Sequence, residues 1–450
     1  VAGKAPTGPH PALLRAVDGL FSGAWPRAAQ ELRAPPLQPA ALPQDAADDP
    51  CGPAVPAPVQ ELCAELAGQL DGAAAAMRKG RWEACSVAAR GVRTAAWASL
   101  FRASAGGWRR SCERELFMLA ELLLGLCAEA VGDAAAAVER ADAVFVFAAA
   151  GSFRDAALLF VRWLDDRVQA SRPAPAAATE ATAAFPASAP RWARRAPPAC
   201  AAAATREQAP SQQRLHELVK AREPFVVTGM LEDWPARERW TSLAYLDGTV
   251  GHRLVPVEVG SQVGGAEWRE ELMSMGDFLG THLAPSCEYC GHWMEPRKFK
   301  AGVAYLAQHE LLEQCPVLRA DVALPEDWRK VMGKPTRTNA WLGTHGTVTP
   351  CHWDSYDNFL AQVQGTKRAL LLAPGERSRL YVRPCGSGPS AQGNVSQVDV
   401  EAPDLGRFPE FAHARLVVAD LGPGDALFIP QGWWHQVRAL TPSFSVNFWF

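Results

Sequence analysis

The sequence predicts an α+β protein with two main domains, an N-terminal α-helical domain followed by an all-β double-stranded β-helix, or jelly roll, with flanking helices. Residues 60–166 contain no proline, and their apolar residues recur at helical spacing. From about residue 224 onward, short alternating runs are separated by glycine and proline turns, a pattern typical of strands. An alanine- and proline-rich stretch lies between the two patterns, and it has too few large apolar residues to form a core.

Bulk properties limit the function classes. The 450 residues are too many for one small domain and indicate about two. The net charge of −3 at pH 7 provides no global basic field for nucleic acid. No apolar run reaches the roughly 18 residues that a membrane-spanning helix needs, so we expect no direct membrane contact. The 11 cysteines lack a repeated framework, which suits a reducing compartment.

The N-terminal half divides into three segments. We expect residues 1–56 to be low in complexity and partly disordered, apart from a short helix at 12–20. Residues 57–170 predict five or six helices in antiparallel hairpins. This helical domain either packs on the second domain or offers a repeat surface to a protein partner, and the sequence leaves both readings open. Residues 171–211 form the predicted linker.

Residues 212–450 form the predicted second domain. It begins with a short helix at 215–221, and another helix is expected at 276–283. Strands are expected near 224–229, 252–260, 339–344, 358–364, 368–373, 415–420, 426–429, 434–440 and 444–450. The long polar connection at 380–411 is typical of a functional lid or an insertion.

A metal site is predicted from His352, Asp354 and His435. His352 and Asp354 are two residues apart, so on an extended strand both side chains point to the same face. A jelly roll can place the distant His435 beside them. Two imidazoles and one carboxylate on one face of a metal form the facial triad of non-haem Fe(II) oxygenases, which leaves open positions for a bidentate 2-oxo acid and for O2.

Several neighbouring features carry a resemblance to a known family. A strand entry rich in glycine and threonine precedes the pair at 341–349, and Lys367 follows Asp354 by 13 residues. The turn–strand–turn run at 422–430 leads into His435. Together with the aromatic C-terminal segment, these features resemble the JmjC (jumonji-C) branch of the cupin-fold 2-oxoglutarate oxygenases, from about residue 225 to residue 450.

The resemblance implies a dioxygenase that binds Fe(II) and uses 2-oxoglutarate and O2 as co-substrates. Lys367 would pair with the distal carboxylate of 2-oxoglutarate, because a buried ammonium needs a charged partner. The resemblance assigns the remaining co-substrate contacts to Tyr305, Trp341, Thr349 and Asn358.

The resemblance also implies that the protein hydroxylates C-3 of arginine residues in protein or peptide substrates. Glu258 would hold the guanidinium in a bidentate pair, between aromatic walls formed by Trp268 and Trp449. The sequence departs from the family at its end, where Phe450 stands in place of a second consecutive tryptophan. The implied substrates are histone tails and ribosomal or chromatin-associated proteins. They indicate a chromatin regulator in the nucleus, with the cytoplasm as an alternative.

Other functions remain open. A histone methyl-lysine demethylase, or an arginine-directed endopeptidase that cuts histone tails, would use the same metal. A cupin isomerase or sugar-binding barrel would carry an additional Glu and His and would lack the pairing of Lys367 with Tyr305. A non-catalytic barrel is least favoured, because the triad is intact. Cys287, Cys290 and His292 resemble a zinc pattern without a nearby fourth ligand, so we expect a loop insertion there.

Overall fold

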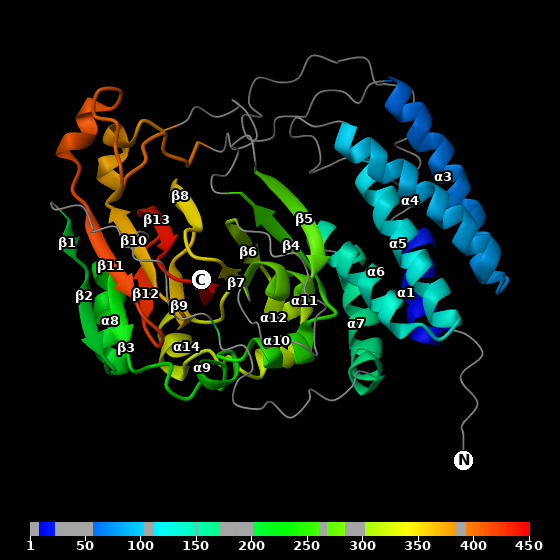
Figure 1. Cartoon of the computed structure of the whole chain (residues 1–450), viewed down its shortest axis with the longest axis horizontal. Helices are drawn as coiled ribbons and strands as arrows, with labels where there is room; N and C mark the ends of the chain where they lie inside the picture. The colour runs from blue at the N-terminus through cyan, green and yellow to red at the C-terminus, as the bar shows by residue number, and fades with distance from the viewer. Residues whose placement is uncertain are drawn as a thin grey trace. The chain divides into compact units, whose positions relative to one another are not determined.

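The chain forms two compact units in the computed structural model, Val1–Arg172 and Pro173–Phe450 (Figure 1). The residues that the structure describes are 9–22, 57–102, 112–148, 152–171, 185, 201–260, 268–283, 302–382 and 393–450. The cysteine and histidine group at 287–292 and most of the segments expected to be disordered or linking lie outside these residues.

The first unit is entirely helical within its described residues. Its helices are α1 (Pro11–Ser22), α3 (Ala57–Arg78), α4 (Trp82–Arg102), α5 (Cys112–Ala130), α6 (Ala134–Phe147) and α7 (Ser152–Ser171). Each helix from α3 to α7 packs on the next one along the chain (Figure 1). Gly80 and Gly132 adopt positive φ where α3 and α5 end, because glycine has no Cβ to oppose this turn. The predicted helical domain is confirmed.

Helix α5 is the centre of this unit and carries buried carboxylates. Glu121 accepts hydrogen bonds from Arg93 on α4 at 2.5 Å and from Arg140 on α6 at 3.2 Å. Glu129 accepts a hydrogen bond from Arg167 on α7 at 2.5 Å. A buried carboxylate is tolerated when it is paired and hydrogen-bonded. These pairs therefore fix the rotation of three helices about α5.

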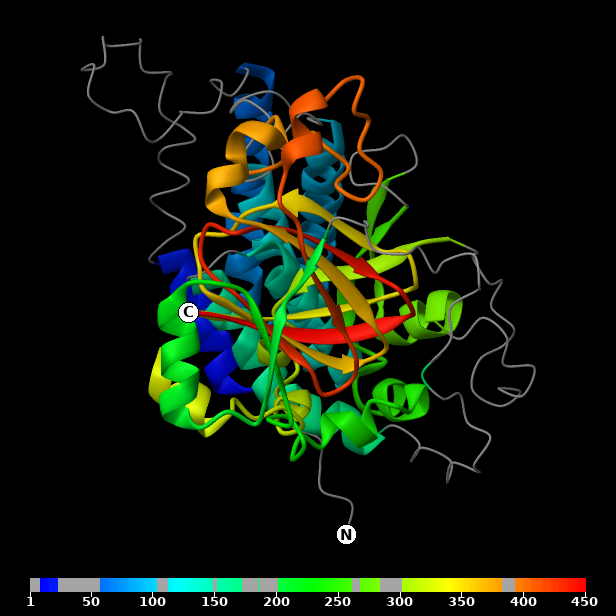
Figure 2. The same cartoon turned by 90° about the vertical axis from the view of Figure 1, so that its left-hand side faces the viewer.

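The described residues of the second unit form two β-sheets, and the predicted jelly-roll architecture is confirmed (Figure 2). One sheet has the strand order β1 (Ala202–Ala203), β11 (Val417–Leu421), β10 (Lys367–Leu372), β13 (Trp434–Ala439) and β8 (Val348–His352). The other has the order β2 (Thr205–Gln208), β3 (Phe225–Thr228), β12 (Ala426–Ile429), β9 (Asn358–Gln364), β14 (Ser443–Trp449), β7 (Arg337–Gly343), β6 (Ala304–His309), β4 (Leu254–Val259) and β5 (Arg269–Ser274).

Short helices flank the sheets. They are α8 (Gln212–Ala221), α9 (Ala236–Arg239), α10 (Leu243–Val250), α11 (Met275–Phe278), a π-helical turn (Leu279–Leu283), α12 (Leu311–Gln314), α13 (Pro316–Arg319), α14 (Glu326–Met332) and two 3₁₀ turns (Pro374–Leu380 and Pro409–His413). Residues from the helices and from the nine-stranded sheet share the largest core of this unit. The helices therefore cover one face of that sheet.

Period-two alternation sorts the strand residues between the inside and the outside of the jelly roll. On β10, Ala369 and Leu371 belong to the core between the two sheets. Leu370 and Leu372 face the opposite side and pack against the connection that precedes β11. Lys367 has the same parity as Ala369, so the alternation directs its side chain into the interior.

The structure corrects the expected linker boundary at residue 211. Two short strands precede it, since β1 pairs in parallel with β11 and β2 pairs in parallel with β3. Phe185 is buried, and its backbone N–H donates to the carbonyl oxygen of Thr241 at 2.6 Å. The composition did not predict these strands, because a strand at the edge of a sheet is held by backbone hydrogen bonds and does not need an alternating apolar pattern. Strands β5 and β6 were also not predicted.

The helices and cysteines of the described residues bear on two further predictions. Among the described helices, none is both long enough and apolar enough to span a membrane. Cys85, Cys127 and Cys351 are free thiols, whereas Cys63 is in a disulfide that the cysteine pattern did not predict.

We predict that the unit beginning at Pro173 folds alone and that Phe185 anchors its first segment. Phe185→Ala in this fragment should lower the free energy of unfolding by about 3–5 kcal/mol, because it removes a buried aromatic ring. Urea denaturation measures the change. Leu405→Ala, at an exposed position, is the control and should stay within about 0.5 kcal/mol. Equal losses in the two variants would contradict the anchoring role.

Candidate metal centre

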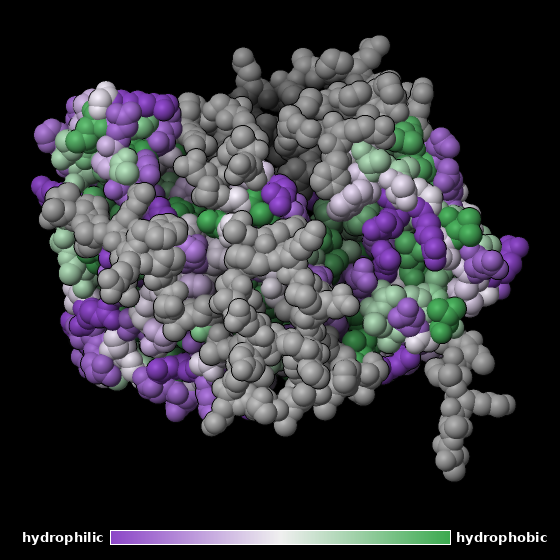
Figure 3. Space-filling view, in the orientation of Figure 1, coloured by the Kyte–Doolittle hydropathy of each residue, from purple (hydrophilic) through white to green (hydrophobic). Residues whose placement is uncertain are grey.

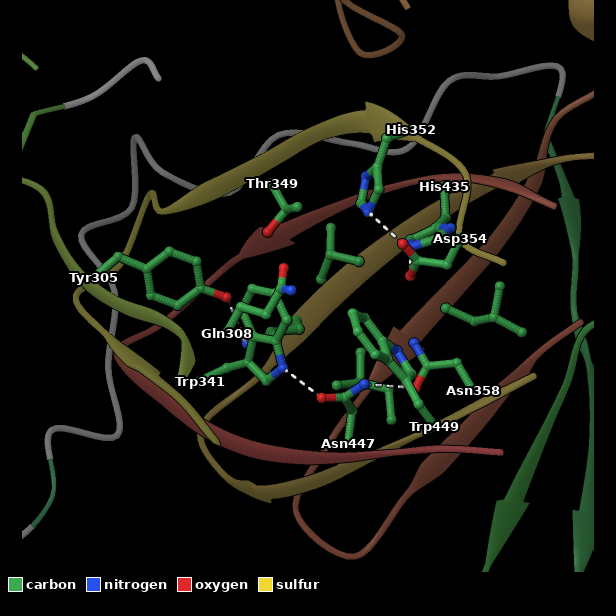
Figure 4. A pocket seen from close by; sticks show the side chains of 14 residues that line it. Tyr305, Gln308, Trp341, Thr349, His352, Asp354, Asn358, His435, Asn447 and Trp449 are labelled. Atoms are coloured by element: carbon green, nitrogen blue, oxygen red, sulfur yellow. Dashed lines mark hydrogen bonds and ion pairs between the residues drawn. The ribbon is translucent and has the colours of Figure 1, made fainter. Parts of the chain in front are cut away.

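Strand pairing brings two of the three predicted ligands together. In the antiparallel pair of β8 and β13, His352 lies directly opposite His435, and their ring centroids are 4.3 Å apart (Figure 4). Asp354 was expected on the same strand, but β8 ends at His352. Asp354 lies in the following loop, where its backbone oxygen accepts a hydrogen bond from Gly432 at 3.0 Å.

The loop position of Asp354 still places its carboxylate between the two imidazoles. Oδ1 lies 3.5 Å from Nε2 of His352, and Oδ2 lies 3.6 Å from Nε2 of His435. The candidate ligand atoms of the three residues all lie within 4.8 Å of one another. A metal with bonds of about 2.0–2.2 Å to nitrogen and oxygen holds ligand atoms at similar separations. The geometry of the donor set therefore fits one first-row metal ion.

Backbone carbonyls orient both imidazoles. Nδ1 of His352 lies 2.8 Å from the carbonyl oxygen of Pro350, and Nδ1 of His435 lies 3.0 Å from that of Trp433. An Nδ1–H that donates to a carbonyl leaves the lone pair on Nε2. In its neutral form, each ring therefore presents the unprotonated Nε2 toward Asp354, where it can bind either a proton or a metal ion.

The electrostatics of the cluster favour displacement of a proton by a cation. Burial lowers the pKa of His352, but the hydrogen bond and charge of Asp354 together with backbone hydrogen bonds outweigh burial, so this pKa lies above its ordinary value. Burial and the charge of His352 lower the pKa of His435 to about 4. Burial raises the pKa of Asp354, but the hydrogen bond of His352 and the charges of both histidines hold it below its ordinary value. A metal ion would take the place of the proton on His352.

The cluster opens into a cavity inside the jelly roll that contains about 410 Å³ of space, part of it open to solvent. Nine of its lining residues are ones that the sequence predicted: Tyr305, Trp341, Thr349, His352, Asp354, Asn358, Lys367, His435 and Trp449. The other lining residues are Gln308, Leu360, Ile429, Val437 and Asn447. Glu258 and Trp268 do not line this cavity.

Two β-bulges place side chains in the cavity that regular alternation would turn away. Between β13 and β8, the register passes from His435–His352 to Val437–Thr349, so β8 has one extra residue and both Thr349 and His352 face inward. Between β6 and β7, a similar shift lies between Leu306 and His309. Gln308 adopts φ 46° there and lines the cavity beside Tyr305 (Figure 4).

Lys367 is a buried cation whose ammonium faces the cavity. It is 1% exposed, and burial lowers its pKa to about 7. Nζ donates to the hydroxyl of Tyr305 at 3.2 Å, and no described carboxylate pairs with it. Burial also raises the pKa of Tyr305, which keeps its hydroxyl protonated. A buried ammonium without a counter-charge costs free energy, so a carboxylate ligand fits this position.

A hydrogen-bonded row of amides crosses the cavity floor, and the sequence reasoning missed its central member, Asn447. The indole N–H of Trp341 donates to Oδ1 of Asn447 at 2.8 Å, and Nδ2 of Asn447 donates to Oδ1 of Asn358 at 3.0 Å (Figure 4). The Asn358 oxygen is therefore occupied, which leaves its N–H groups as donors to a ligand. No motif identifies Asn447, because its role depends on pairing between β14, β7 and β9.

Glu258 lies next to the cavity rather than in its lining. Across the strands it is opposite Tyr305 on β6 and opposite Glu270 on β5. Burial, followed by the charge of Glu270, raises its pKa to about 7, while Trp268 acts in the opposite direction. The Trp268 indole nitrogen is buried without a hydrogen-bond partner among the described residues, so Trp268 lies close to Glu258 without bonding to it. Glu258 has no cationic partner among the described residues.

Trp449 forms part of the cavity wall at the end of β14. Its ring stacks on Tyr356 with a centroid distance of 5.1 Å and an interplanar angle of 7°. Its indole nitrogen is buried without a hydrogen-bond partner in the described chain. The stack fixes the ring plane, which suits a wall for a flat ligand group.

Comparison with known proteins agrees with this geometry. The profile of a family described as a cupin-like domain matches residues 210–450, which is more than half of the chain. The chain belongs to the cupin-like domain family. The JmjC resemblance is also confirmed, since this cupin-like chain is similar to proteins that carry the JmjC name.

Curated relatives cover the cupin-like unit. "Lysine-specific demethylase 8" of Xenopus tropicalis is 39% identical over 241 residues, which are 53% of this chain and 50% of that protein. "Jumonji C domain-containing protein 5" of Drosophila melanogaster is 37% identical over 235 residues, 51% of this chain and 55% of that protein. "Lysine-specific demethylase JMJ30" of Arabidopsis thaliana is 37% identical over 227 residues, 50% and 49% respectively. The matches span about half the length of these relatives.

We predict that Asp354→Asn abolishes tight metal binding while the fold is kept. An amide cannot supply the negative charge, so affinity for Co(II), a spectroscopic substitute for Fe(II), should fall by more than the 10- to 100-fold or so that outer-shell changes cause. Absorption titration measures it. Asp357→Asn is the matched control, since Asp357 bonds Arg222 and the backbone of Gln431 instead. Unchanged Co(II) affinity in Asp354→Asn would contradict the assignment.

Proposed function

We propose that this cupin-like protein is an Fe(II)- and 2-oxoglutarate-dependent oxygenase that hydroxylates arginine residues in protein or peptide substrates. The observation that carries the proposal is the triad of His352, Asp354 and His435 at one end of a cavity that also contains the buried ammonium of Lys367. A carboxylate-bearing co-substrate would satisfy the metal and the ammonium together. Family membership supports the same class of chemistry.

The residues of the cavity divide the binding of 2-oxoglutarate among them. Lys367 and the Tyr305 hydroxyl are 3.2 Å apart and can both hold the distal carboxylate. Thr349 and Asn358 supply further hydrogen bonds from the lining. Trp341 closes one wall, and its bond to Asn447 fixes the ring.

The metal ligands and the enclosure have separate roles. Bound Fe(II) would supply the activation of O2, with 2-oxoglutarate as the reductant. His352, Asp354 and His435 would hold the metal through three donors, which would leave it accessible to the co-substrates. Leu360, Ile429 and Val437 line the cavity with apolar groups, which limits water near the reacting atoms.

The substrate arginine is proposed from the charge of Glu258 and from the neighbouring ring of Trp268. Glu258 is buried without a cationic partner among the described residues, and burial raises its pKa. A guanidinium would stabilise the ionised carboxylate through two parallel hydrogen bonds. Trp268 can flank the planar guanidinium beside Glu258. Trp449, which the resemblance gives as the second wall, lines the cavity but pairs with Arg337 on β7, six residues along that strand from Gly343, the partner of Tyr305. An ammonium gains less than a guanidinium from a bidentate carboxylate and a flat ring, which favours arginine over lysine.

A second candidate function is demethylation of methyl-lysine, which the names of the Xenopus and Arabidopsis relatives favour. The same metal and co-substrate would serve it, and an arginine-directed endopeptidase would use the metal without 2-oxoglutarate. The nature of the product separates the three. For the proposed hydroxylase we also propose histone tails or ribosomal and chromatin-associated proteins as substrates, and the nucleus as the main location.

We predict that Lys367→Met weakens 2-oxoglutarate binding by about 1.5–3 kcal/mol, which is about 10- to 100-fold. The wild-type pKa of about 7 adds a pH signature. The bound carboxylate favours the charged ammonium, so binding takes up a proton above pH 7 and affinity falls as pH rises from there. Calorimetry across pH measures both effects. An identical pH slope in Lys367→Met would show that another group titrates.

We predict that peptides containing arginine gain one oxygen atom on that residue, with succinate formed in equal amount. Glu258→Gln should remove most of this turnover, because losing one partner of a buried charge pair costs about 2–5 kcal/mol. Glu271→Gln is the matched control, since Glu271 pairs with Arg269. Mass spectrometry identifies the product. Loss of methyl groups from methyl-lysine would support the demethylase, and chain cleavage without succinate would support the peptidase.

A further inference from the structure

The helical unit contains a groove that the proposed oxygenase chemistry does not use. It encloses about 1520 Å³ of space, part of it open to solvent. Helix α4 forms one side, α6 forms the other and the C-terminal half of α5 forms the floor. Three consecutive helices of an antiparallel array thus make a concave surface, the kind that binds peptides in helical-repeat proteins.

Positive charge is in excess along the middle of this groove. Arg93 and Arg140 share one buried carboxylate, that of Glu121. Arg90 donates to the Ser86 hydroxyl at 3.2 Å and forms no ion pair with any described residue. Three guanidinium groups against one carboxylate leave two uncompensated positive charges.

The acidic residues of the lining lie at one end. Glu83 is in the first turn of α4, and Asp133 caps the start of α6, where its side chain accepts a hydrogen bond from the backbone of Ala136. Helices α4 and α6 both begin at this end of the antiparallel array, and Arg90 is about two turns further along α4. The carboxylates therefore do not neutralise the middle of the groove.

Apolar side chains stand at the mouth of the groove. Val87 is 68% exposed and Val131 is 78% exposed, the two highest values among the large hydrophobic residues that the structure describes as exposed. Both belong to the lining, together with the ring of Trp82. Over the part of the molecule where Figure 1 places α4–α6, Figure 3 shows hydrophilic residues bordered by hydrophobic ones. Exposed apolar residues next to uncompensated charge indicate an interaction surface.

We infer that this groove binds an acidic peptide segment of a partner protein, with carboxylates in its middle and apolar side chains against Val87 and Val131. Planar guanidinium groups match carboxylates in bidentate pairs, so Arg90 supplies the main unmatched donor. The apolar rim adds contacts that an ion alone would not use. A nucleic acid fits less well, because two uncompensated charges neutralise few phosphates.

The experiment uses the full chain and a short fluorescein-labelled peptide in which glutamates flank a pair of leucines. Fluorescence polarisation should show binding that weakens as salt rises. The same peptide with glutamine for glutamate should bind at least about tenfold more weakly, since charge-assisted hydrogen bonds are lost. A peptide with lysine for glutamate should not bind.

Variants of the chain test the location. Arg90→Glu should weaken binding of the acidic peptide by at least about tenfold, and Arg90→Gln by a smaller factor. Val87→Asp should also weaken binding. Arg162→Glu is the matched control, because Arg162 is exposed on α7 outside the groove, and it should leave affinity unchanged. Circular dichroism confirms that each variant keeps its helices.

Several outcomes would overturn the inference. They are no binding of the acidic peptide, equal binding by its glutamine counterpart, or equal losses in Arg90→Glu and Arg162→Glu. A DNA oligonucleotide that competes as well as the peptide would replace a protein partner with nucleic acid. Self-association in sedimentation that Val87→Asp abolishes would make the groove an interface between copies. If changing Asp45, Asp48 and Asp49 to Asn tightens peptide binding, the acidic stretch of this chain that contains them competes for the groove and is its occupant.

Discussion

The metal centre depends on one strand pairing, that of β8 with β13, which places His352 directly opposite His435. Strands in this pair are held by backbone hydrogen bonds, so the separation of the two imidazoles is set by the sheet rather than by side-chain choice. Asp354 is then fixed from a second direction, because its backbone accepts a hydrogen bond from Gly432 just before β13. A slip of the register by one residue would turn one imidazole to the other face.

Inside the jelly roll, burial shifts the pKa values of two ionisable side chains toward neutral pH. Lys367 is ordinarily basic and Glu258 ordinarily acidic, yet burial brings the pKa of each to about 7. Each group is short of a counter-charge within the described residues. In the proposed function, the co-substrate carboxylate and the substrate guanidinium provide these counter-charges. The site is thus prepared for ligands of opposite sign, at a free-energy cost that the jelly-roll core must offset.

The helical unit uses buried charge differently. Glu121 and Glu129 on α5 are paired with arginines from neighbouring helices, so these charges serve the packing of the unit. Pairing leaves an excess of positive charge on one concave side, where Arg90 has no described acidic partner. The same ion pairs that fix the helices therefore also determine which side of the unit can attract an acidic ligand.

The sequence by itself determined the fold class, the order of most strands and nine of the residues that line the cavity. The fold class and the strands follow from alternation and glycine turns, and the metal ligands from motif spacing. Tyr305, Trp341, Thr349, Asn358 and Trp449 follow from the family resemblance. The roles assigned to the site residues stay predictions. Asp354 was placed on a strand and lies in a loop, because local spacing does not show where β8 ends.

Only the tertiary structure decided the remaining features. The bulges that turn Thr349 and Gln308 inward, the bonds of Asn447 and the edge strands before residue 211 all depend on which strands become neighbours. The groove of the helical unit likewise requires α4 and α6 to flank α5. The physical reason is the same in each case. Such features are set by hydrogen bonds and packing between segments far apart in the chain, and local propensity carries no information about them.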